Sequence, residues 1–470
     1  FNHSALLSRA GMESLRETLG IPRGVTFEGF EPDSEEGRWC RRSAMRLGLG
    51  DEARLSSPAA SAAGAKPARS RGLPQGLPVC AADVPYGLPG PDRPLDVTST
   101  QEALGRALVR LEGLPKVGER IVTSSPDVSV STGLATWINT VGRFCLRPVT
   151  DFEAGRPKIL DWRASERGRH IELGISEMNL FTLLGQLGLS HEMNGQLLFP
   201  VGTLYDPFVC RGLDALIFGL YSGSRFIFAG TPSGVSLAPE GGAHQSSVTA
   251  ALGMELPGLD YFEPCFARET EWALLEGLRG CCDREGGRST YLRLSTKPVD
   301  QRLMEPALAR WGVDGVREAA LAGGYVLREA GDAALGRGAP LVHLVSCGAM
   351  IPEAIAAAEY LEREGVAANV IHLVSPRRAR ESWQSRAGSE DHVMARLIPP
   401  AQRRAPIVTV QDGAASALSW VGGVFGQPTT PLGVCRFGQS GLRQDLYRSM
   451  HIDVDSILCA AFEAVERSGS

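Results

Sequence analysis

Short apolar segments alternate with longer helical stretches over residues 120 to 294 of the chain. The segments that we expect to form strands are Arg120–Thr123, His170–Gly174, Leu197–Leu204, Arg225–Gly230, Tyr261–Cys265 and Thr290–Leu294, and the helical stretches are Glu177–Leu189, Pro207–Tyr221 and Glu269–Leu278. Buried strands that alternate with helices form parallel sheets with helices on both faces. The pattern therefore predicts an α/β fold built around a parallel sheet.

A second, smaller α/β unit is expected after the chain leaves the first one near Lys297–Asp314. Its predicted strands are Tyr325–Arg328, Leu341–Ser346, Ala368–Leu373 and Ile407–Val410, and its predicted helices are Pro352–Glu364 and Asp455–Arg467. At 470 residues the chain is too long for one ordinary core. We therefore expect one domain over residues 96–310 and another over residues 311–470.

The first 95 residues differ from the rest in composition. Residues 1 to about 55 are polar, with one helix-like stretch at Met12–Leu19. The segment from Ser56 to about Pro94 is rich in Ala, Ser, Pro and Gly and has few large apolar residues. This composition predicts an extended linker or surface arm.

Charge and cysteine usage exclude several classes of protein. A net charge of −5 argues against a general binder of nucleic acids or membrane surfaces. The sequence contains no run of 18 consecutive apolar residues, so we expect no membrane-spanning helix. The ten cysteines form no Cys-x-x-Cys pair and no zinc-like cluster. Free buried thiols in a reducing compartment are the simplest interpretation. If the protein is bacterial, we expect it in the cytoplasm, and if it is eukaryotic, in mitochondria or plastids. Of these compartments we prefer the cytoplasm.

The stretch IELGISEMN, residues 171–179, is the sharpest local feature. A predicted strand runs into Gly174, and Ser176 then opens a helix with Glu177 in its first turn. Taken alone, Ser176 is an N-cap and Glu177 complements the helix dipole. The alternative is a functional carboxylate at the carboxyl edge of a parallel sheet, where such sheets bind ligands.

Three further loops carry polar or aromatic side chains. Glu240 and His244 lie in the glycine-rich stretch LAPEGGAHQS before a helix; a lone histidine is more often a surface residue, but this position favours function. Tyr205 and Phe208 lie three residues apart where a strand meets a helix, and either pack in the core or stack on a flat heteroaromatic ring. Asp127 lies in the polar loop SSPDVSVSTG, which is a weak signal.

Together these stretches resemble the homodimeric-type pyruvate dehydrogenase decarboxylating component, a member of the transketolase-like family of thiamine diphosphate enzymes. The resemblance runs from about Asp96 to Val465 and includes RHIELGISEMNLF, GTLYDPFVCRGLDAL, AGTPSGVSLAPEGGAHQS, YLRLSTKPV and LGVCRFGQSG. It implies a pyrimidine-binding α/β domain followed by a transketolase-like C-terminal domain.

The resemblance also implies roles for single residues. Glu177 matches the glutamate that contacts N1′ of the cofactor's aminopyrimidine, where a carboxyl group favours the imino tautomer that activates the thiazolium. His244 matches the active-site histidine, and Tyr205 and Phe208 match aromatic residues beside the pyrimidine ring. Asp127 and Glu240 are carried over as further cofactor-binding residues. No metal ligand is expected in this chain.

One part of the family's site has no counterpart in the sequence. The family binds Mg²⁺ and the cofactor's diphosphate through a separate domain marked by Gly-Asp-Gly, and the chain contains no such tripeptide. We therefore expect a shared site in a dimer or heterotetramer, with a diphosphate-binding domain supplied elsewhere and a lipoyl-bearing acyltransferase as further partner. Transketolase, another 2-oxo acid dehydrogenase and a non-catalytic paralogue remain alternatives.

Overall fold

The computed structural model describes residues 9–21, 30–46, 79–88, 96–146, 162–331, 338–386 and 388–469. Its contacts divide the chain into two compact units, residues 1–75 with 192–195, and residues 76–191 with 196–470. In the first unit, α1 (Arg9–Thr18) confirms the helix expected near Met12–Leu19, and α2 (Glu35–Arg46) was not expected. The domain boundaries expected at residues 95 and 310 stay predictions.

An eight-stranded sheet forms the first part of the second unit, in the order β4-β3-β5-β2-β6-β7-β9-β8. Every neighbouring pair of these strands is parallel. The strands are β2 (Ile121–Pro126), β3 (Arg143–Phe144), β4 (Ala164–Ser165), β5 (His170–Leu173), β6 (Phe199–Leu204), β7 (Ile227–Gly230), β8 (Leu259–Phe262) and β9 (Ser289–Arg293). The predicted parallel sheet is thus confirmed.

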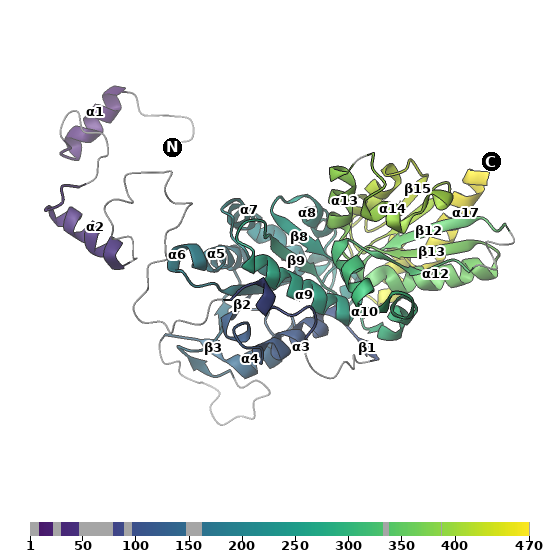
Figure 1. The fold of residues 1–470 in the computed structure, drawn as a ribbon, viewed down its shortest axis with the longest axis horizontal. Coiled ribbons are helices and arrows are strands. Elements are labelled where there is room, and N and C mark those ends of the chain that lie inside the picture. Colours follow the sequence, from purple (N-terminus) through teal and green to yellow (C-terminus); the bar gives the residue numbers. More distant parts are fainter. Residues whose placement is uncertain are drawn as a thin grey trace. The chain divides into compact units, whose positions relative to one another are not determined.

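Helices cover both faces of this sheet (Figure 1). Buried side chains of α3 (Thr100–Glu112), α4 (Ala135–Val141) and α9 (Ala267–Cys282) share one core with Ile227 and Ala229 of β7. Those of α5 (Glu177–Gly188), α7 (Leu213–Tyr221) and α8 (Thr249–Glu255) share another with Phe228. Successive residues of one strand therefore enter opposite cores, as alternation along a strand requires.

The second sheet has five strands in the order β11-β13-β12-β14-β15, and only its edge strand β11 pairs antiparallel. These strands are β11 (Tyr325–Arg328), β12 (Leu341–Ser346), β13 (Ala367–His372), β14 (Ile407–Val410) and β15 (Thr429–Leu432). The surrounding helices are α10 (Glu305–Ala322), α12 (Ile351–Arg363), α13 (Pro376–Ser385), α14 (Val393–Leu397), α15 (Ser416–Ser419), α16 (Arg443–Met450) and α17 (Val454–Gly469). β15 was not predicted because it is short, only partly buried and contains Pro431.

Part of the segment expected as a linker belongs to the second unit and is packed within it. Of the segment Ser56–Pro94, residues 79–88 are described, and Val84 there is fully buried. The guanidinium of Arg279 donates to the Val84 carbonyl at 2.6 Å, and the Leu88 amide donates to Glu271 at 2.8 Å. The few apolar residues of this stretch thus suffice to anchor it, and the linker or surface arm expected over the whole segment stays a prediction. The rest of the expected linker lies outside the described residues.

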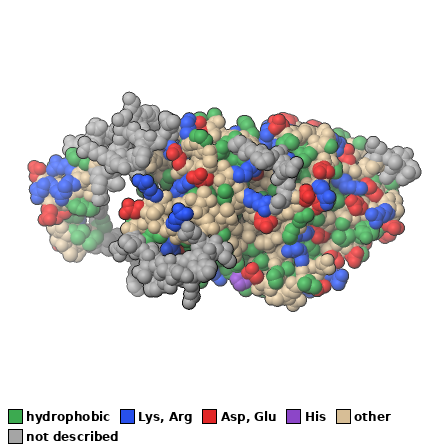
Figure 2. Space-filling model, turned by 90° about the horizontal axis from the view of Figure 1, so that it is seen from below, with side chains coloured by type: hydrophobic (Ala, Val, Ile, Leu, Met, Phe, Trp, Pro, Cys, Tyr) green, Lys and Arg blue, Asp and Glu red, His purple; other side chains and the backbone are tan. Residues whose placement is uncertain are grey.

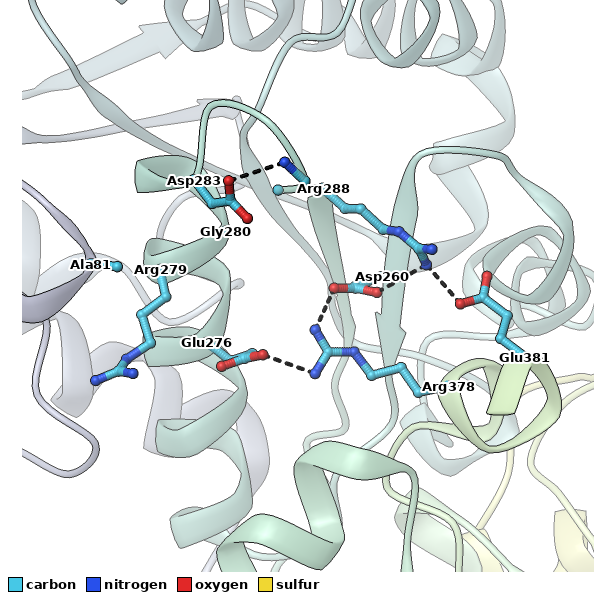
Figure 3. Close-up of a pocket in the computed structure, with 11 residues that line it drawn as sticks. Ala81, Asp260, Glu276, Arg279, Gly280, Asp283, Arg288, Arg378 and Glu381 are labelled. Carbon is cyan, nitrogen blue, oxygen red and sulfur yellow. Dashed lines mark hydrogen bonds and ion pairs between the residues drawn. The ribbon is translucent and has the colours of Figure 1, made fainter. Parts of the chain in front are cut away.

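Ion pairs of helix α13 connect the five-stranded sheet to the eight-stranded one. Arg378 on α13 donates to Asp260 of β8 at 2.5 Å and to Glu276 of α9 at 2.9 Å, and Arg288 pairs with Glu381 of α13 at 2.7 Å. Figure 3 shows these side chains pointing toward one another around a cavity of about 460 Å³. The cavity is lined by charged groups of both signs, and the ion pairs across it link α13 to the larger sheet.

Surface and thiol features agree with most of the expectations from composition. On the face shown in Figure 2, basic and acidic side chains are interspersed. None of the described helices combines the length and the apolar character needed to cross a membrane. All ten cysteines are free, as expected, but five of them are exposed, so the expectation of buried thiols holds only in part.

Candidate functional site

The segment after β6 forms a 3₁₀-helix, η4 (Asp206–Gly212), before α7 begins at Leu213. A 3₁₀-helix has three residues per turn, so side chains three apart lie directly above one another. Tyr205, Phe208 and Arg211 form such a column. The Tyr205 and Phe208 rings stack with centroids 6.0 Å apart, and the Arg211 guanidinium lies 3.6 Å from the Phe208 centroid. The α-helix expected over Pro207–Tyr221 is thus correct only from Leu213 onwards.

Glu177 begins α5, directly beyond the carboxyl end of β5, and its side chain is buried. One carboxylate oxygen, Oε1, accepts a hydrogen bond from Nη1 of Arg211 at 3.2 Å. Ser176 is the N-cap residue of α5, as expected, but its side chain makes no capping hydrogen bond. The carboxylate of Glu177 therefore faces the η4 column.

His244 ends the short 3₁₀-helix η6 (Gly242–His244) in the loop after β7. Its ring meets Tyr205 and Phe208 edge-on, each with a centroid separation of 5.4 Å. Nδ1 of His244 is buried and has no hydrogen-bond partner among the described residues. A buried ring nitrogen without a partner is costly, so this atom is well suited to receive a hydrogen-bonding ligand.

Glu177, Tyr205, Phe208 and His244 are thus brought together, with Arg211 joining the glutamate to the rings. Asp127 and Glu240 are not part of this cluster. The side chains of both are exposed, and neither shows a contact with the four clustered residues. Asp127 has a positive φ of 66°, and its amide donates to Oε1 of Glu172 at 3.0 Å. Their cofactor-binding roles remain proposals.

Glu172 is a polar residue at the carboxyl end of β5 that the sequence interpretation passed over. It accepts hydrogen bonds from Ser129 at 2.6 Å and from the Asp127 amide, and its Oε2 lies 3.2 Å from Nε2 of His170. Burial raises the pKa of Glu172, but the hydrogen bonds from His170 and Ser129 outweigh this and hold it below its ordinary value. This glutamate fixes the loop that carries Asp127.

A fully buried ionic network lies beneath the site. Arg293 of β9 donates to Asp206 at 3.0 Å, to Glu263 at 2.7 Å and to the Asp412 carbonyl at 2.6 Å. Burial lowers the pKa of Arg293, but the charges of Glu263 and Asp206 outweigh this and raise it well above its ordinary range. Asp206 also accepts from Ser246. One arginine thus ties the start of η4 to the segment that follows His244.

The turn that leads to His244 is held from the second sheet. The carboxylate of Asp412, just after β14, accepts from the amides of Val235 at 2.7 Å and Ser236 at 2.9 Å. Burial raises the pKa of Asp412. Gly234 has a φ of 65°, and a Cβ atom there would meet the Asp412 carboxylate at 2.1 Å, so only glycine fits. Gly234, Val235 and Ser236 belong to the stretch AGTPSGVSLAPEGGAHQS, but the sequence did not show that they meet Asp412, because strand and loop positions alone do not show which side chains meet.

A cavity of about 490 Å³ lies against another face of η4. It is lined by Pro207 and Cys210 of η4, by residues 242–243 and 245–249, and by residues 436–438 of the RFGQSG stretch. Gln245 donates to the carbonyls of Ala238 and Gln439, each at 3.1 Å. Two stretches that the resemblance singled out separately thus meet beside the site. Over the described residues, no group of three or more His, Cys, Asp and Glu side chains could hold a metal ion.

Comparisons with known proteins agree with this fold. Residues 323–453 match the family model of the transketolase-like TK C-terminal domain. Among curated proteins, the chain is 23% identical over 414 residues to the pyruvate dehydrogenase E1 component of Mycolicibacterium smegmatis, covering 82% of this chain and 42% of that protein. It is 26% identical over 311 residues to a transketolase of Sinorhizobium medicae, covering 65% and 38%. The chain therefore spans less than half the length of these relatives.

Solved structures show the same architecture. A transketolase from Leishmania mexicana superposes with a TM-score of 0.61 at 18% identity, covering 83% of this chain and 48% of that one. A structure titled "Split gene transketolase, inactive beta4 tetramer" superposes with a TM-score of 0.52 at 22% identity, covering 78% of this chain and 99% of that one. The expected transketolase-like fold, a parallel-sheet domain followed by a smaller mixed-sheet domain, is confirmed.

Proposed function

We propose that this chain, which has a transketolase-like fold and C-terminal domain, supplies the pyrimidine-binding half of a thiamine diphosphate site. The whole enzyme would decarboxylate a 2-oxo acid, with pyruvate as the preferred substrate. The observation that carries this proposal is the meeting of Glu177, Tyr205, Phe208 and His244 at the carboxyl edge of the parallel sheet.

The residues present fit the pyrimidine end of the cofactor. Glu177 offers a buried carboxylate, Tyr205 and Phe208 offer aromatic surface, and His244 offers a buried ring nitrogen without a partner. When bound, thiamine diphosphate supplies a thiazolium that acts as nucleophile and as electron sink for the loss of carbon dioxide. Among the described residues, no group of three or more His, Cys, Asp and Glu side chains could hold Mg²⁺. We assign Mg²⁺ and the diphosphate that it binds to a domain supplied elsewhere.

Each residue of the cluster has a role that its position supports. Glu177 would hold a proton shared with N1′ of the pyrimidine, where burial strengthens the hydrogen bond. His244 would bind or protonate groups derived from the substrate through its ring nitrogens. Tyr205 and Phe208 would keep water from the pyrimidine ring, and Asp127 and Glu240 would contact the cofactor from the neighbouring loops.

The partners follow from the missing half of the site. A dimer or heterotetramer with a chain or segment carrying the diphosphate-binding domain would complete it, and a lipoyl-bearing acyltransferase would accept the acetyl group. The resemblance to a split-gene transketolase chain, 99% of which is covered, supports an arrangement in which separate chains build one site. We retain the cytoplasm as the preferred compartment.

Transketolase activity is a second candidate. Residues 323–453 match the model of the transketolase-like TK C-terminal domain, and several relatives are named transketolase. One of the matching transketolase structures is titled as a complex with sedoheptulose-7-phosphate. Ketol transfer between sugar phosphates and oxidation of pyruvate can be assayed side by side on the assembled enzyme. Turnover of pyruvate with an artificial electron acceptor supports the first proposal, and turnover of ketose phosphates alone supports the second.

The half-site is tested by titrating the 470-residue chain with thiamine diphosphate and Mg²⁺ in a calorimeter. We expect little magnesium-dependent binding by the chain alone, and tight binding once a diphosphate-binding domain is added. Tight, magnesium-dependent binding by the chain alone would contradict the proposal of a divided site. No binding in the completed assembly would instead support a non-catalytic, structural or regulatory role.

A further inference from the structure

We propose that Arg211 caps the ring-binding face of the site and must be displaced before a flat heteroaromatic ligand can bind. The inference rests on the proposed function, because that function places an aminopyrimidine ring beside Phe208 and Glu177. It adds a gating residue that belongs to this chain and acts before the cofactor is bound.

Arg211 occupies both groups that such a ring would use. Its guanidinium lies 3.6 Å from the centroid of Phe208. It also donates to Oε1 of Glu177 at 3.2 Å. The other side of the Phe208 ring faces Tyr205. In a 3₁₀-helix, Tyr205 and Arg211, three residues before and three residues after Phe208, lie on opposite sides of its ring. Phe208 thus has no free face for stacking while Arg211 stays in place.

The cap can open without disturbing the core. The side chain of Arg211 is 53% exposed, whereas that of Glu177 is 7% exposed. Arginine can therefore swing into solvent while the carboxylate stays buried. For a ligand that binds only the open state, the apparent affinity is the affinity of the open state multiplied by the fraction of chains that are open. The cation–π contact with Phe208 and the ion pair with Glu177 are each weak at a half-exposed arginine. Together we expect them to lower the affinity for the ring about five- to tenfold.

The test uses the pyrimidine half of the cofactor, 4-amino-5-hydroxymethyl-2-methylpyrimidine, as probe. This compound has no diphosphate, so it needs neither Mg²⁺ nor a partner domain. Ligand-observed NMR titration gives its Kd for the 470-residue chain and for the variants Arg211→Met, Arg211→Lys and Glu177→Gln. The matched control is Arg448→Met on α16, an exposed arginine that pairs with Asp445 at 3.8 Å.

We expect Arg211→Met to bind the probe about five- to tenfold more tightly than the unchanged chain, and Arg448→Met to bind it equally well. Arg211→Lys keeps the charge but loses the planar stacking, so its Kd should lie in between. Added salt weakens the ion pair with Glu177 and should therefore tighten probe binding by the unchanged chain. Salt should have no such effect on Arg211→Met. A merely structural role of Arg211 would not produce this difference in salt dependence between the unchanged chain and the variant.

The outcomes separate the cap from the proposed function. If Arg211→Met binds no more tightly while Glu177→Gln abolishes binding, the cap is wrong and the site stands. If Arg211→Met binds more weakly, the arginine helps to hold the ligand and the cap is again wrong. If neither the unchanged chain nor any variant shows saturable binding, both proposals are overturned, because the probe requires only residues of this chain.

Discussion

Glu177 and His244 differ from most buried polar residues in how their polar atoms are used. Buried polar groups normally find partners in the fold itself. The only described partner of the Glu177 carboxylate is a half-exposed arginine, and Nδ1 of His244 has none among the described residues. The segment that carries His244 is held on both sides, because Asp412 accepts from the Val235 amide at 2.7 Å and Arg293 donates to the Ser246 hydroxyl at 3.2 Å. A rigid frame around incompletely bonded groups is what a ligand site requires.

At the residue scale, we predict that Glu177→Gln abolishes cofactor activation in the assembled enzyme. The amide cannot share a proton with N1′ as a carboxyl group does, so kcat should fall about 100-fold or more. The fold should persist, because Gln can still accept the hydrogen bond from Arg211. Steady-state kinetics and circular dichroism of the variant check both points, with the exposed Glu285→Gln as control. Normal turnover would remove the main support for the proposed function.

The local helix type decides what each side chain of η4 can reach. In a 3₁₀-helix, residues three apart are eclipsed, whereas in an α-helix they are offset by about 60°. Asp206, Val209 and Gly212 therefore face the core, Phe208 and Arg211 face the site, and Pro207 and Cys210 line the neighbouring cavity. Gly212 allows the close approach of α5, since a Cβ atom there would lie 2.4 Å from the Phe181 ring. As an α-helix, this segment would not stack Arg211 directly over Phe208.

The prediction at the element scale concerns the start of α9. Glu269 there accepts from Tyr325 of β11 at 2.7 Å, and its Oε2 lies 3.0 Å from Nε2 of His372 of β13. Burial raises the pKa of Glu269, but His372 and the hydrogen bonds lower it below its ordinary value of 4.5. Its contribution to stability is therefore complete above about pH 4.5 and is lost as the pH falls through the lowered pKa.

Glu269→Gln should consequently lower the free energy of unfolding at neutral pH by about 2 kcal/mol, because a charged, buried hydrogen-bond acceptor is lost. The difference from the unchanged protein should shrink toward acidic pH. Urea unfolding at several pH values measures this difference. A deficit that stays constant down to the acid transition would show that the charge of Glu269 is not what stabilises the contact.

On the scale of the whole second unit, the two sheets are joined by charged groups as well as by apolar packing. Arg293 links Asp206 and Glu263 of the larger sheet to the backbone at Asp412 beyond β14. Arg378 of α13 makes a second connection on Asp260 and Glu276 (Figure 3). Since Asp412 also holds the turn before His244, the geometry of the site depends on how the second sheet is docked.

We predict that Arg378→Met weakens this docking. Asp260 and Glu276 would lose a cation that lies 2.5 and 2.9 Å away, so the free energy of unfolding should fall by about 2 kcal/mol. Arg302→Met removes a largely exposed arginine from its pair with Asp300 and serves as control, with an expected change under about 0.5 kcal/mol. Thermal unfolding of the three proteins measures both effects. Equal losses in the two variants would mean that the α13 contact is no more than a surface ion pair.

The sequence by itself determined the α/β class and most strand positions, because periodicity is a local property of the chain, and its resemblance to a known family named Glu177, Tyr205, Phe208 and His244 as candidate site residues. It did not predict the short strand β15, the docked residues 79–88 or the 3₁₀ form of η4, where weak local preferences are overruled by packing. The Arg211–Glu177 pair and the network around Arg293 were decided only by tertiary structure. Their partners are 30 or more residues apart in sequence, and no local pattern encodes which charges meet after folding.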